Sequence, residues 1–376
     1  MVNTKLLIFT GFFLVFPLIT AAGQDTATAD LIKQLSLRQD KQPIRQASYW
    51  QKPKRIVITL LDQQKKSKPD AIDWLREVAG GAEIIVANSR KVSPDLLKGA
   101  EVLLGYCNHH NLEHGKQLRF ILNYSAGVDR CISSPLAKQR EIMVTNMQRV
   151  YGPGIAEHVI AMMYMLTRKL YVYHERQQLH QWDRKAVQRA SMWEVQDRTM
   201  LVVGLGGIGT EVAKRAHALG MKVIAIRNSS RSGPDFVDKV GLPTDLHQFA
   251  GKADIVVNTT PLTPKTKGMF NQQFFRTMRK GTYFINVGRG KSVVTSDLIT
   301  ALNNGHLGGA ALDVQDPEPL PENHPLWTAK NVVITPHISA SSSRRMSRYW
   351  LLVRENLRRY VNGERMLNVV NLKRGY

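Results

Sequence analysis

Short hydrophobic runs alternate with helix-length polar spacers along most of this chain. In its first half, apolar or β-branched runs occupy residues 55–61, 83–88, 101–106, 120–126 and 142–147. Runs of this kind are typical of β-strands. Some of the spacers, such as 70–78, have a helical pattern. The alternation predicts an α/β domain in which helices cover a parallel sheet.

The second half of the chain repeats this pattern, and its strands end in polar residues. Apolar runs lie in the segments 253–268, 281–294, 308–321 and 331–340, and each run leads into a loop that holds a polar or charged side chain. In open α/β sheets, ligands bind at the carboxyl ends of the strands. The pattern therefore predicts a second doubly wound domain with its functional residues along one sheet edge.

A short segment of glycine and proline separates the two halves of the chain. Gly152, Pro153 and Gly154 precede a helical pattern that continues to Trp182, which predicts a hinge and then one long helix. An amphipathic pattern at 341–361 predicts a helix that packs back on the first domain. We therefore divide the chain into a first domain at 55–152, completed by 341–376, and a second domain at 153–340.

The second domain opens with a glycine motif between two strands. Gly204, Gly206 and Gly209 follow the apolar run 200–203 and precede a helical pattern and a second strand at 222–226. The first glycine permits a tight turn, the second lets the backbone approach a pyrophosphate, and the third lets helix and strand pack closely. The helix N-terminus offers unpaired N–H groups to the phosphates. This order predicts a dinucleotide site that also includes Leu205, Gly207 and Ile208.

The loop after the second strand bears on the choice of cofactor. The acidic residue that would bind a ribose 2′-hydroxyl is missing, because the first acid beyond the strand is Asp235. Guanidinium groups and hydroxyls, which suit a 2′-phosphate, stand there instead. The loop favours NADP(H) over NAD(H), although a solvated basic loop would have the same composition. The loop residues are Arg227, Asn228, Ser229, Ser230 and Arg231.

The N-terminal residues differ in composition from the rest. At 1–23, Lys5 precedes an apolar stretch that ends in the small residues Ala21, Ala22 and Gly23, which is the layout of a secretory signal peptide. A membrane anchor and a mis-assigned start codon are alternatives, and the last would leave the protein cytoplasmic. Residues 24–54 are polar and mixed, so we expect a poorly ordered lead-in.

The composition, the cysteines and the clustered histidines limit the kinds of site and partner that this chain can have. The 376 residues are 43% hydrophobic, enough for two ordinary cores. The net charge of +22 is spread along the chain, which indicates attraction to anionic ligands and gives no sign of a nucleic-acid surface. Cys107 and Cys131 are interpreted as buried thiols, with a disulfide as the alternative. A surface loop is the favoured interpretation of His109, His110 and His114, and we expect no metal site.

Three further side chains lie at the predicted ligand edge. Arg289 stands between two glycines, Glu318 in a proline-rich loop, and His337 directly after a strand. Each alone has an ordinary structural explanation. Beside a dinucleotide site, they supply the groups that reduce a carbonyl. Arg289 can hold an anion and polarise the C=O, His337 can donate a proton, and Glu318 can orient the imidazole and keep it protonated.

These motifs resemble those of the D-isomer-specific 2-hydroxyacid dehydrogenases, from about Arg55 to Asn368. The resemblance implies a flavodoxin-like substrate domain and a Rossmann dinucleotide-binding domain with the active site in the cleft between them. It also implies homodimers joined through the cofactor domains. The matching stretches are SAGVD (125–129), AEH (156–158), GLGGIG (204–209), TTPLTPKTKG (259–268), NVGRG (286–290), ALDV (311–314), EP (318–319) and TPHISA (335–340).

The resemblance also implies roles for single residues. Arg289, Glu318 and His337 would form the catalytic triad, and Asp313 would contact the nicotinamide side of the cofactor. Ser125, Ala126 and Gly127 would bind the substrate carboxylate, and further cofactor contacts are expected from Thr260, Pro261, Thr266, Val287 and Gly288.

The basic loop resembles that of NADP-using glyoxylate and hydroxypyruvate reductases. The implied activity is reduction of a small 2-oxo acid to the D-2-hydroxy acid by hydride transfer from NAD(P)H. The alternative is a non-catalytic, NAD(P)-sensing binding protein of the same fold.

Overall fold

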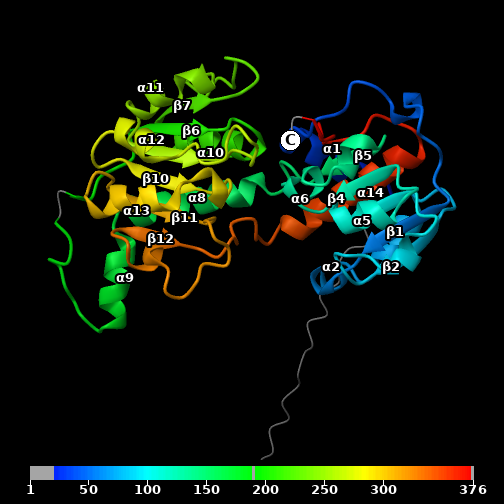
Figure 1. Cartoon of the computed structure of the whole chain (residues 1–376), viewed down its shortest axis with the longest axis horizontal. Helices are drawn as coiled ribbons and strands as arrows, with labels where there is room; N and C mark the ends of the chain where they lie inside the picture. The colour runs from blue at the N-terminus through cyan, green and yellow to red at the C-terminus, as the bar shows by residue number, and fades with distance from the viewer. Residues whose placement is uncertain (1–20, 189–190, 374–376) are drawn as a thin grey trace, which may run out of the picture.

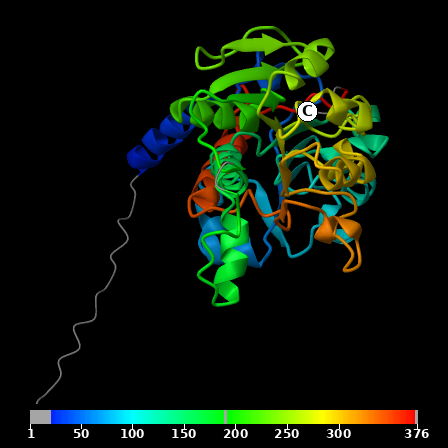
Figure 2. The same cartoon turned by 90° about the vertical axis from the view of Figure 1, so that its left-hand side faces the viewer.

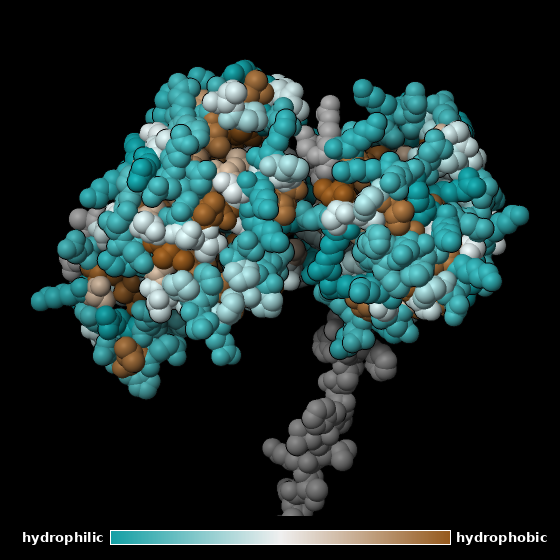
Figure 3. All heavy atoms as spheres, in the orientation of Figure 1, coloured by the Kyte–Doolittle hydropathy of each residue, from teal (hydrophilic) through white to brown (hydrophobic). Residues whose placement is uncertain are grey.

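A computed structural model describes residues 21–188 and 191–373 and arranges them as two α/β domains (Figure 1). The signal-like segment falls almost entirely outside these ranges. The two sheets have five and seven strands, and neighbouring strands in both run parallel, as predicted. In Figure 3 the domains form two lobes with a largely hydrophilic surface. Within the described ranges, no helix combines the length and the apolar character needed to cross a bilayer.

The first sheet has the strand order β2-β1-β3-β4-β5. This is the order of flavodoxin-like domains, and it confirms the prediction for the first half of the chain. Each predicted apolar run contains one strand. The strands are β1 (Arg55–Thr59), β2 (Glu83–Ala87), β3 (Val102–Gly105), β4 (Phe120–Asn123) and β5 (Met143–Asn146). The helices are α2 (Asp62–Ser67), α3 (Ala71–Arg76), α4 (Pro94–Leu97), α5 (His109–His114), α6 (Asp129–Ile132) and α7 (Leu136–Gln139).

The C-terminal helix returns to this first domain. Helix α14 (Arg345–Val361) buries Tyr349, Leu352 and Tyr360 in the same core as the first sheet. The ring of Tyr360 stacks on Phe120 of β4 with the centroids 4.7 Å apart. The prediction of an amphipathic helix packed against the first domain is therefore confirmed.

The segment before β1 is folded, so the expectation of a poorly ordered lead-in is wrong. It forms α1 (Ala21–Gln34) and a short 3-10 helix (Ile44–Gln46). Leu31 and Leu35, one helical turn apart, are buried in the core of the first domain, and Leu37 and Ile44 join them. The few apolar residues are spaced to share one face, and the polar residues between them hide that spacing from a composition-based interpretation.

The second sheet has the strand order β12-β11-β10-β9-β6-β7-β8. The chain starts in β6, moves outward through β7 and β8, and then returns to β9 on the other side of β6, which is the Rossmann arrangement. The strands are β6 (Thr199–Val203), β7 (Lys222–Ile226), β8 (Lys239–Gly241), β9 (Ile255–Asn258), β10 (Tyr283–Asn286), β11 (Gly309–Leu312) and β12 (Val332–Ile334). The helices that follow β6 are α10 (Gly207–Ala218), α11 (Leu246–Ala250), α12 (Gln272–Thr277) and α13 (Thr295–Asn303).

The predicted long helix after the hinge is two helices. Helix α8 (Gly152–Thr167) packs on α10, and α9 (Leu170–Gln178) starts beyond Lys169, whose φ of +54° is left-handed. No residue of α9 is buried, whereas one face of α8 is. The sequence keeps a helical pattern through Lys169, so the break is not visible in it. In Figures 1 and 2, α9 extends away from the body of the domain.

The two cysteines form a disulfide, so the interpretation as buried thiols is wrong. Cys107 follows β3 and Cys131 lies on α6, which follows β4, with their Cα atoms 4.9 Å apart. Both residues are buried. The pairing of β3 with β4 brings together two residues that are 24 positions apart in the chain. The disulfide thereby anchors α6 to the loop after β3.

Candidate active site

The carboxyl ends of β10, β11 and β12 form one edge of the second sheet. Asn286 pairs with Leu312, and Leu312 pairs with Ile334, so these neighbouring strands end level with each other. Arg289 follows β10 and His337 follows β12 at the same distance along the chain. Parallel pairing therefore places the predicted catalytic residues at the same sheet edge.

His337 and Glu318 are in direct contact. The Nδ1 atom of His337 lies 2.9 Å from Oε2 of Glu318, and the other carboxylate oxygen accepts a hydrogen bond of 2.9 Å from the backbone N–H of Gln315. The imidazole is about half exposed, at 53%. With Nδ1 directed to the carboxylate, Nε2 is the ring nitrogen that can meet a substrate.

The backbone of His337 is held in an unusual conformation. Its φ is +52°, in the left-handed region that costs a residue with a side chain about 1–2 kcal/mol. Its N–H donates to the carbonyl of Asp313 at 2.8 Å. Strained residues of this kind persist where the surrounding structure fixes them, and they are common at functional sites.

Asp313 organises the loop that carries His337. Its Oδ1 accepts hydrogen bonds from the hydroxyl of Thr335 (2.6 Å) and the N–H of Ile338 (2.8 Å), and its Oδ2 accepts from the N–H of Ser339 (3.0 Å). Burial opposes ionisation of this carboxyl, but the hydrogen bonds from Ser339 and Thr335 outweigh it and lower its pKa. His158 of α8 joins the network through Nε2, 3.0 Å from the Thr335 hydroxyl.

The network gives Asp313 and His158 a structural role, which the sequence did not indicate: they hold the loop that carries His337. Both oxygens of Asp313 are engaged inside the protein, and its side chain is buried behind the loop. The resemblance implied a contact of Asp313 with the nicotinamide, and that contact stays a prediction. His158 was noted only as part of the AEH motif. Its place in that motif, on the helical pattern predicted after Gly152, Pro153 and Gly154, was the available signal.

Arg289 reaches across to the first domain. Its Nε and Nη2 donate to Oδ2 of Asp129 at 3.0 and 2.9 Å, and its Nη1 donates to the carbonyl of Gly288 at 2.7 Å. A side chain at Gly127 would collide with the guanidinium, so Arg289 lies directly on the predicted substrate turn. Asp129 was quoted in the SAGVD motif without a role, and its pairing is a tertiary relationship.

Two buried asparagines shape the turn at Ser125, Ala126 and Gly127. The Nδ2 of Asn123 donates to the carbonyls of Ser125 (3.1 Å) and Gly127 (3.0 Å), and the Nδ2 of Asn146 donates to the carbonyl of Ala126 (2.6 Å). All three carbonyl groups are thus directed toward the protein interior. This arrangement suits a turn whose N–H groups face an anion.

The glycine motif fits a dinucleotide pyrophosphate. Gly204 has a φ of +101°, and a side chain at Gly209 would collide with the carbonyl of Gly204. A Cβ at Gly206 would meet no atom within 4 Å, so the backbone there is open to close approach. Helix α10 begins at Gly207 and has 12 residues, enough to present a positive N-terminal dipole.

The other predicted cofactor residues occupy the loops after β9 and β10. A side chain at Gly288 would meet the carbonyl of Thr260 at 2.8 Å, so these loops are in contact. Val287 is buried beside them. The hydroxyl of Thr266 donates to the carbonyl of Pro261 at 2.6 Å and closes the loop on itself.

The two arginines of the basic loop after β7 have different partners in the structure. Arg227 donates to the carbonyl of Ser232 at 2.9 Å and lies directly at the strand end. Arg231 instead forms an ion pair with Asp245, with Nη1 2.5 Å from Oδ2. The hydrogen bond from Arg231 lowers the pKa of Asp245. Ser229 is exposed, and Ser230 contacts the Ser232 hydroxyl at 2.9 Å.

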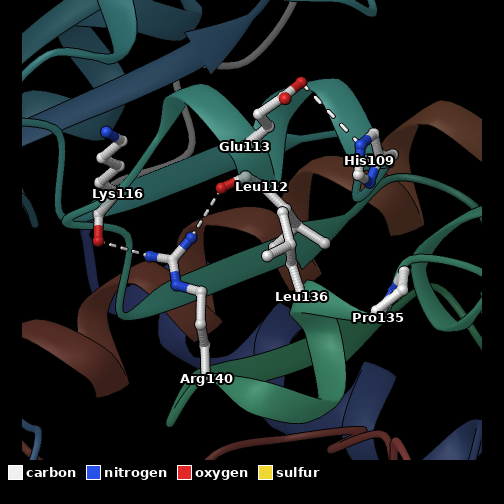
Figure 4. Close-up of a pocket in the computed structure, with 7 residues that line it drawn as sticks. All are labelled: His109, Leu112, Glu113, Lys116, Pro135, Leu136 and Arg140. Atoms are coloured by element: carbon white, nitrogen blue, oxygen red, sulfur yellow. Dashed lines mark hydrogen bonds and ion pairs between the residues drawn. The ribbon is translucent and has the colours of Figure 1, made fainter.

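One hollow in the first domain is lined by none of the candidate catalytic or cofactor residues. Figure 4 shows a cavity of about 620 Å³ between α5 and α7, lined by His109, Leu112, Glu113, Lys116, Pro135, Leu136 and Arg140. Nη1 and Nη2 of Arg140 donate to four carbonyl groups in α5 and in the segment that follows it. The three clustered histidines lie on this helix and not in the loop favoured by the sequence. Among the residues described, no three metal-ligating side chains come together.

Comparison with known proteins places this geometry in context. Residues 160–339 match the model of the D-isomer-specific 2-hydroxyacid dehydrogenase NAD-binding domain. The chain is 34% identical to a glyoxylate reductase of Thermofilum pendens over 268 residues, covering 69% of this chain and 77% of that protein. It is 31% identical to a mouse glyoxylate reductase/hydroxypyruvate reductase over 258 residues, covering 69% and 78%.

A solved structure is similar over most of the chain. The NADPH-dependent glyoxylate/hydroxypyruvate reductase of Sinorhizobium meliloti, in complex with NADP and sulfate, superposes with a TM-score of 0.71 at 27% identity. The match covers 86% of this chain and all of that one.

Proposed function

Because this chain belongs to the D-isomer-specific 2-hydroxyacid dehydrogenase family, and is thus an NAD(P)-dependent oxidoreductase, we propose that it reduces glyoxylate, hydroxypyruvate or a similar small 2-oxo acid. The product is the corresponding 2-hydroxy acid, in the D configuration wherever C2 is a stereocentre. The observation that carries this proposal is the His337–Glu318 pair at the sheet edge shared with Arg289 and the glycine motif.

We assign the chemical steps to three side chains. A dinucleotide held at the glycine turn would supply the hydride. Arg289 binds the substrate carboxylate and polarises the carbonyl, together with the N–H groups of Ser125, Ala126 and Gly127. The Nε2–H of His337 protonates the carbonyl oxygen, which becomes the hydroxyl of the product. Glu318 holds Nδ1 and stabilises the imidazolium before the proton leaves.

We propose NADP(H) as the preferred cofactor. The support is Arg227 at the end of β7, where the adenosine ribose binds in this fold, and the lack of an acid in the loop. Because Arg231 is already paired with Asp245, we assign most of the preference for NADP(H) over NAD(H) to Arg227. The other contacts with the cofactor are expected from the glycine turn and from the loops after β9 and β10. Asp313 would support the nicotinamide side of the site by holding the loop that carries His337.

We also propose a homodimer joined through the cofactor domains. Helix α9 and the residues after it expose Leu170, Leu179 and Trp182, and Trp182 is 94% exposed. Large apolar side chains gathered on a projecting element are typical of an interface. Burial against a second copy would remove them from water.

The experiment that tests the proposed activity is a substrate panel. The purified protein is assayed for oxidation of NADPH and of NADH with glyoxylate, hydroxypyruvate and larger 2-oxo acids, while cofactor binding is measured separately. We expect turnover with a small 2-oxo acid. A protein that binds a dinucleotide and reduces none of the acids would be the non-catalytic sensor, the second candidate.

A further inference from the structure

Arg149 occupies an unusual position at the hinge between the two domains. It lies between β5 and α8, and its φ of +70° is left-handed. A Cβ on Gly207, the first residue of α10, would fall 2.6 Å from Cγ of Arg149 and 3.2 Å from its backbone nitrogen. The Arg149 side chain therefore occupies the space that a side chain at the start of α10 would take.

The side chain of Arg149 is half-buried, and its guanidinium forms a hydrogen bond with one main-chain oxygen. Its Nη1 donates to the carbonyl of Leu35, beyond the end of α1, at 3.3 Å. It forms no salt bridge with any residue in the ranges 21–188 and 191–373. The carboxylate of Glu211, on α10, is already paired with Arg215 at 2.6 Å.

The charges of two other arginines and one carboxylate act on this guanidinium. Burial lowers the pKa of Arg149, the charge of Arg38 lowers it further, Glu211 raises it, and Arg227 lowers it again. Arg38 comes from the segment before β1 and Arg227 from the end of β7. Arg149 itself packs on the first residue of α10, and the charges of Arg38 and Arg227 both act on its guanidinium. Like charges brought together at a partly buried site repel each other unless an anion joins them.

We propose that Arg149 binds the pyrophosphate of the dinucleotide from the hinge side, opposite the backbone N–H groups of the glycine turn. The inference rests on the proposed function, because it concerns the same cofactor. The pyrophosphate binds where the glycine turn meets the α10 N-terminus, and Arg149 packs on the first residue of that helix. Arg227 lies farther along, at the ribose end.

This arrangement gives the segment before β1 a function in cofactor binding. The carbonyl of Leu35 orients the Arg149 guanidinium, and Arg38 adds charge beside it. The backbone of Arg38 is itself fixed, since its carbonyl accepts from the N–H of Asn368 at 2.7 Å. Figure 1 places α1 on the side of the first domain that faces the second. The cofactor would therefore be held by both domains across the hinge.

The test uses calorimetry to measure the equilibrium binding of NADPH and of NADH. The proteins compared are the wild-type chain, Arg149→Gln and Arg149→Lys. The glutamine variant keeps most of the side-chain stem but loses the charge, and the lysine variant keeps the charge. Arg76→Gln is the matched control, because Arg76 is an exposed arginine of α3 paired with Asp73, and the change in net charge is the same. Thermal unfolding of each variant shows whether it is folded.

We expect Arg149→Gln to weaken both dinucleotides by the same factor, about tenfold or more, with partial recovery in Arg149→Lys and no change in Arg76→Gln. Inorganic pyrophosphate should compete with NADH less well in Arg149→Gln than in the wild type. Loss of NADPH affinity alone would overturn the assignment and indicate a 2′-phosphate contact. Unchanged affinity for both would overturn the inference and leave the proposed function intact, whereas a wild-type chain that binds neither would overturn the proposed function itself.

Discussion

Asp129 and Arg289 form an ion pair that joins the two domains. One carboxylate oxygen of Asp129 accepts from both Nε and Nη2 of Arg289, although the residues are 160 positions apart in the chain. The two side chains are about one-third exposed, at 35% and 28%. The pair holds the guanidinium over Gly127, on the turn proposed to bind the substrate carboxylate.

Asp129→Asn should therefore lower kcat/KM for the 2-oxo acid by roughly tenfold or more, because a neutral amide holds the guanidinium less firmly than a carboxylate. Cofactor affinity should stay the same. Asp73→Asn, which breaks the exposed pair with Arg76, serves as the control. If Asp129→Asn behaved like that control, the orientation of Arg289 would not depend on Asp129.

His337→Ala should reduce turnover by roughly two to four orders of magnitude, the usual contribution of a positioned general acid. Cofactor affinity should barely change, since the assigned role is proton donation. Glu318→Gln should cause a smaller loss, because a neutral amide holds Nδ1 of the imidazole less firmly than the carboxylate does. Steady-state kinetics measure both effects. Near-normal turnover in His337→Ala would show that another group donates the proton.

The cofactor proposal predicts unequal effects of the two loop arginines. Arg227→Asp should weaken NADPH strongly, by lost contacts of about 1.5–3 kcal/mol and by charge repulsion, and should spare or help NADH. Arg231→Ala should do less alone, because Arg231 already pairs with Asp245. The double variant should have the largest effect. The quantity to measure is the ratio of kcat/KM for the two cofactors, and a wild-type preference for NADH would refute the proposal.

Reduction of the Cys107–Cys131 disulfide should destabilise the first domain. The bond closes a loop of 24 residues, for which about 3 kcal/mol of stabilisation is expected. Urea unfolding with and without a reductant measures the difference. The variant Cys107→Ala/Cys131→Ala should unfold earlier and respond to no reductant. Activity should fall together with stability, because α6 begins at Asp129. A reductant-insensitive wild-type chain would mean that the thiols are not paired in solution.

Much of the fold could be predicted from local sequence. Every predicted apolar run contains a strand, because a strand inside a helix-covered parallel sheet must be buried and its sequence is apolar for that reason. Parallel pairing brings all carboxyl ends to one edge, so Arg289 and His337 could be assigned to a common site before the structure was known. The glycine turn could be predicted as well, since the conformational demands on its three glycines are local.

The tertiary structure alone decided which residues are partners. Hydrophobic periodicity reports that a residue is buried but not against what, so the sequence left the disulfide open, missed the contribution of Leu31 and Leu35 to the core, and gave no sign of the helix break at Lys169. The contacts of Arg289 with Asp129 and of Arg149 with Gly207 depend on how two separately folded domains meet at the hinge. That geometry is set by packing between distant segments, which no local pattern encodes.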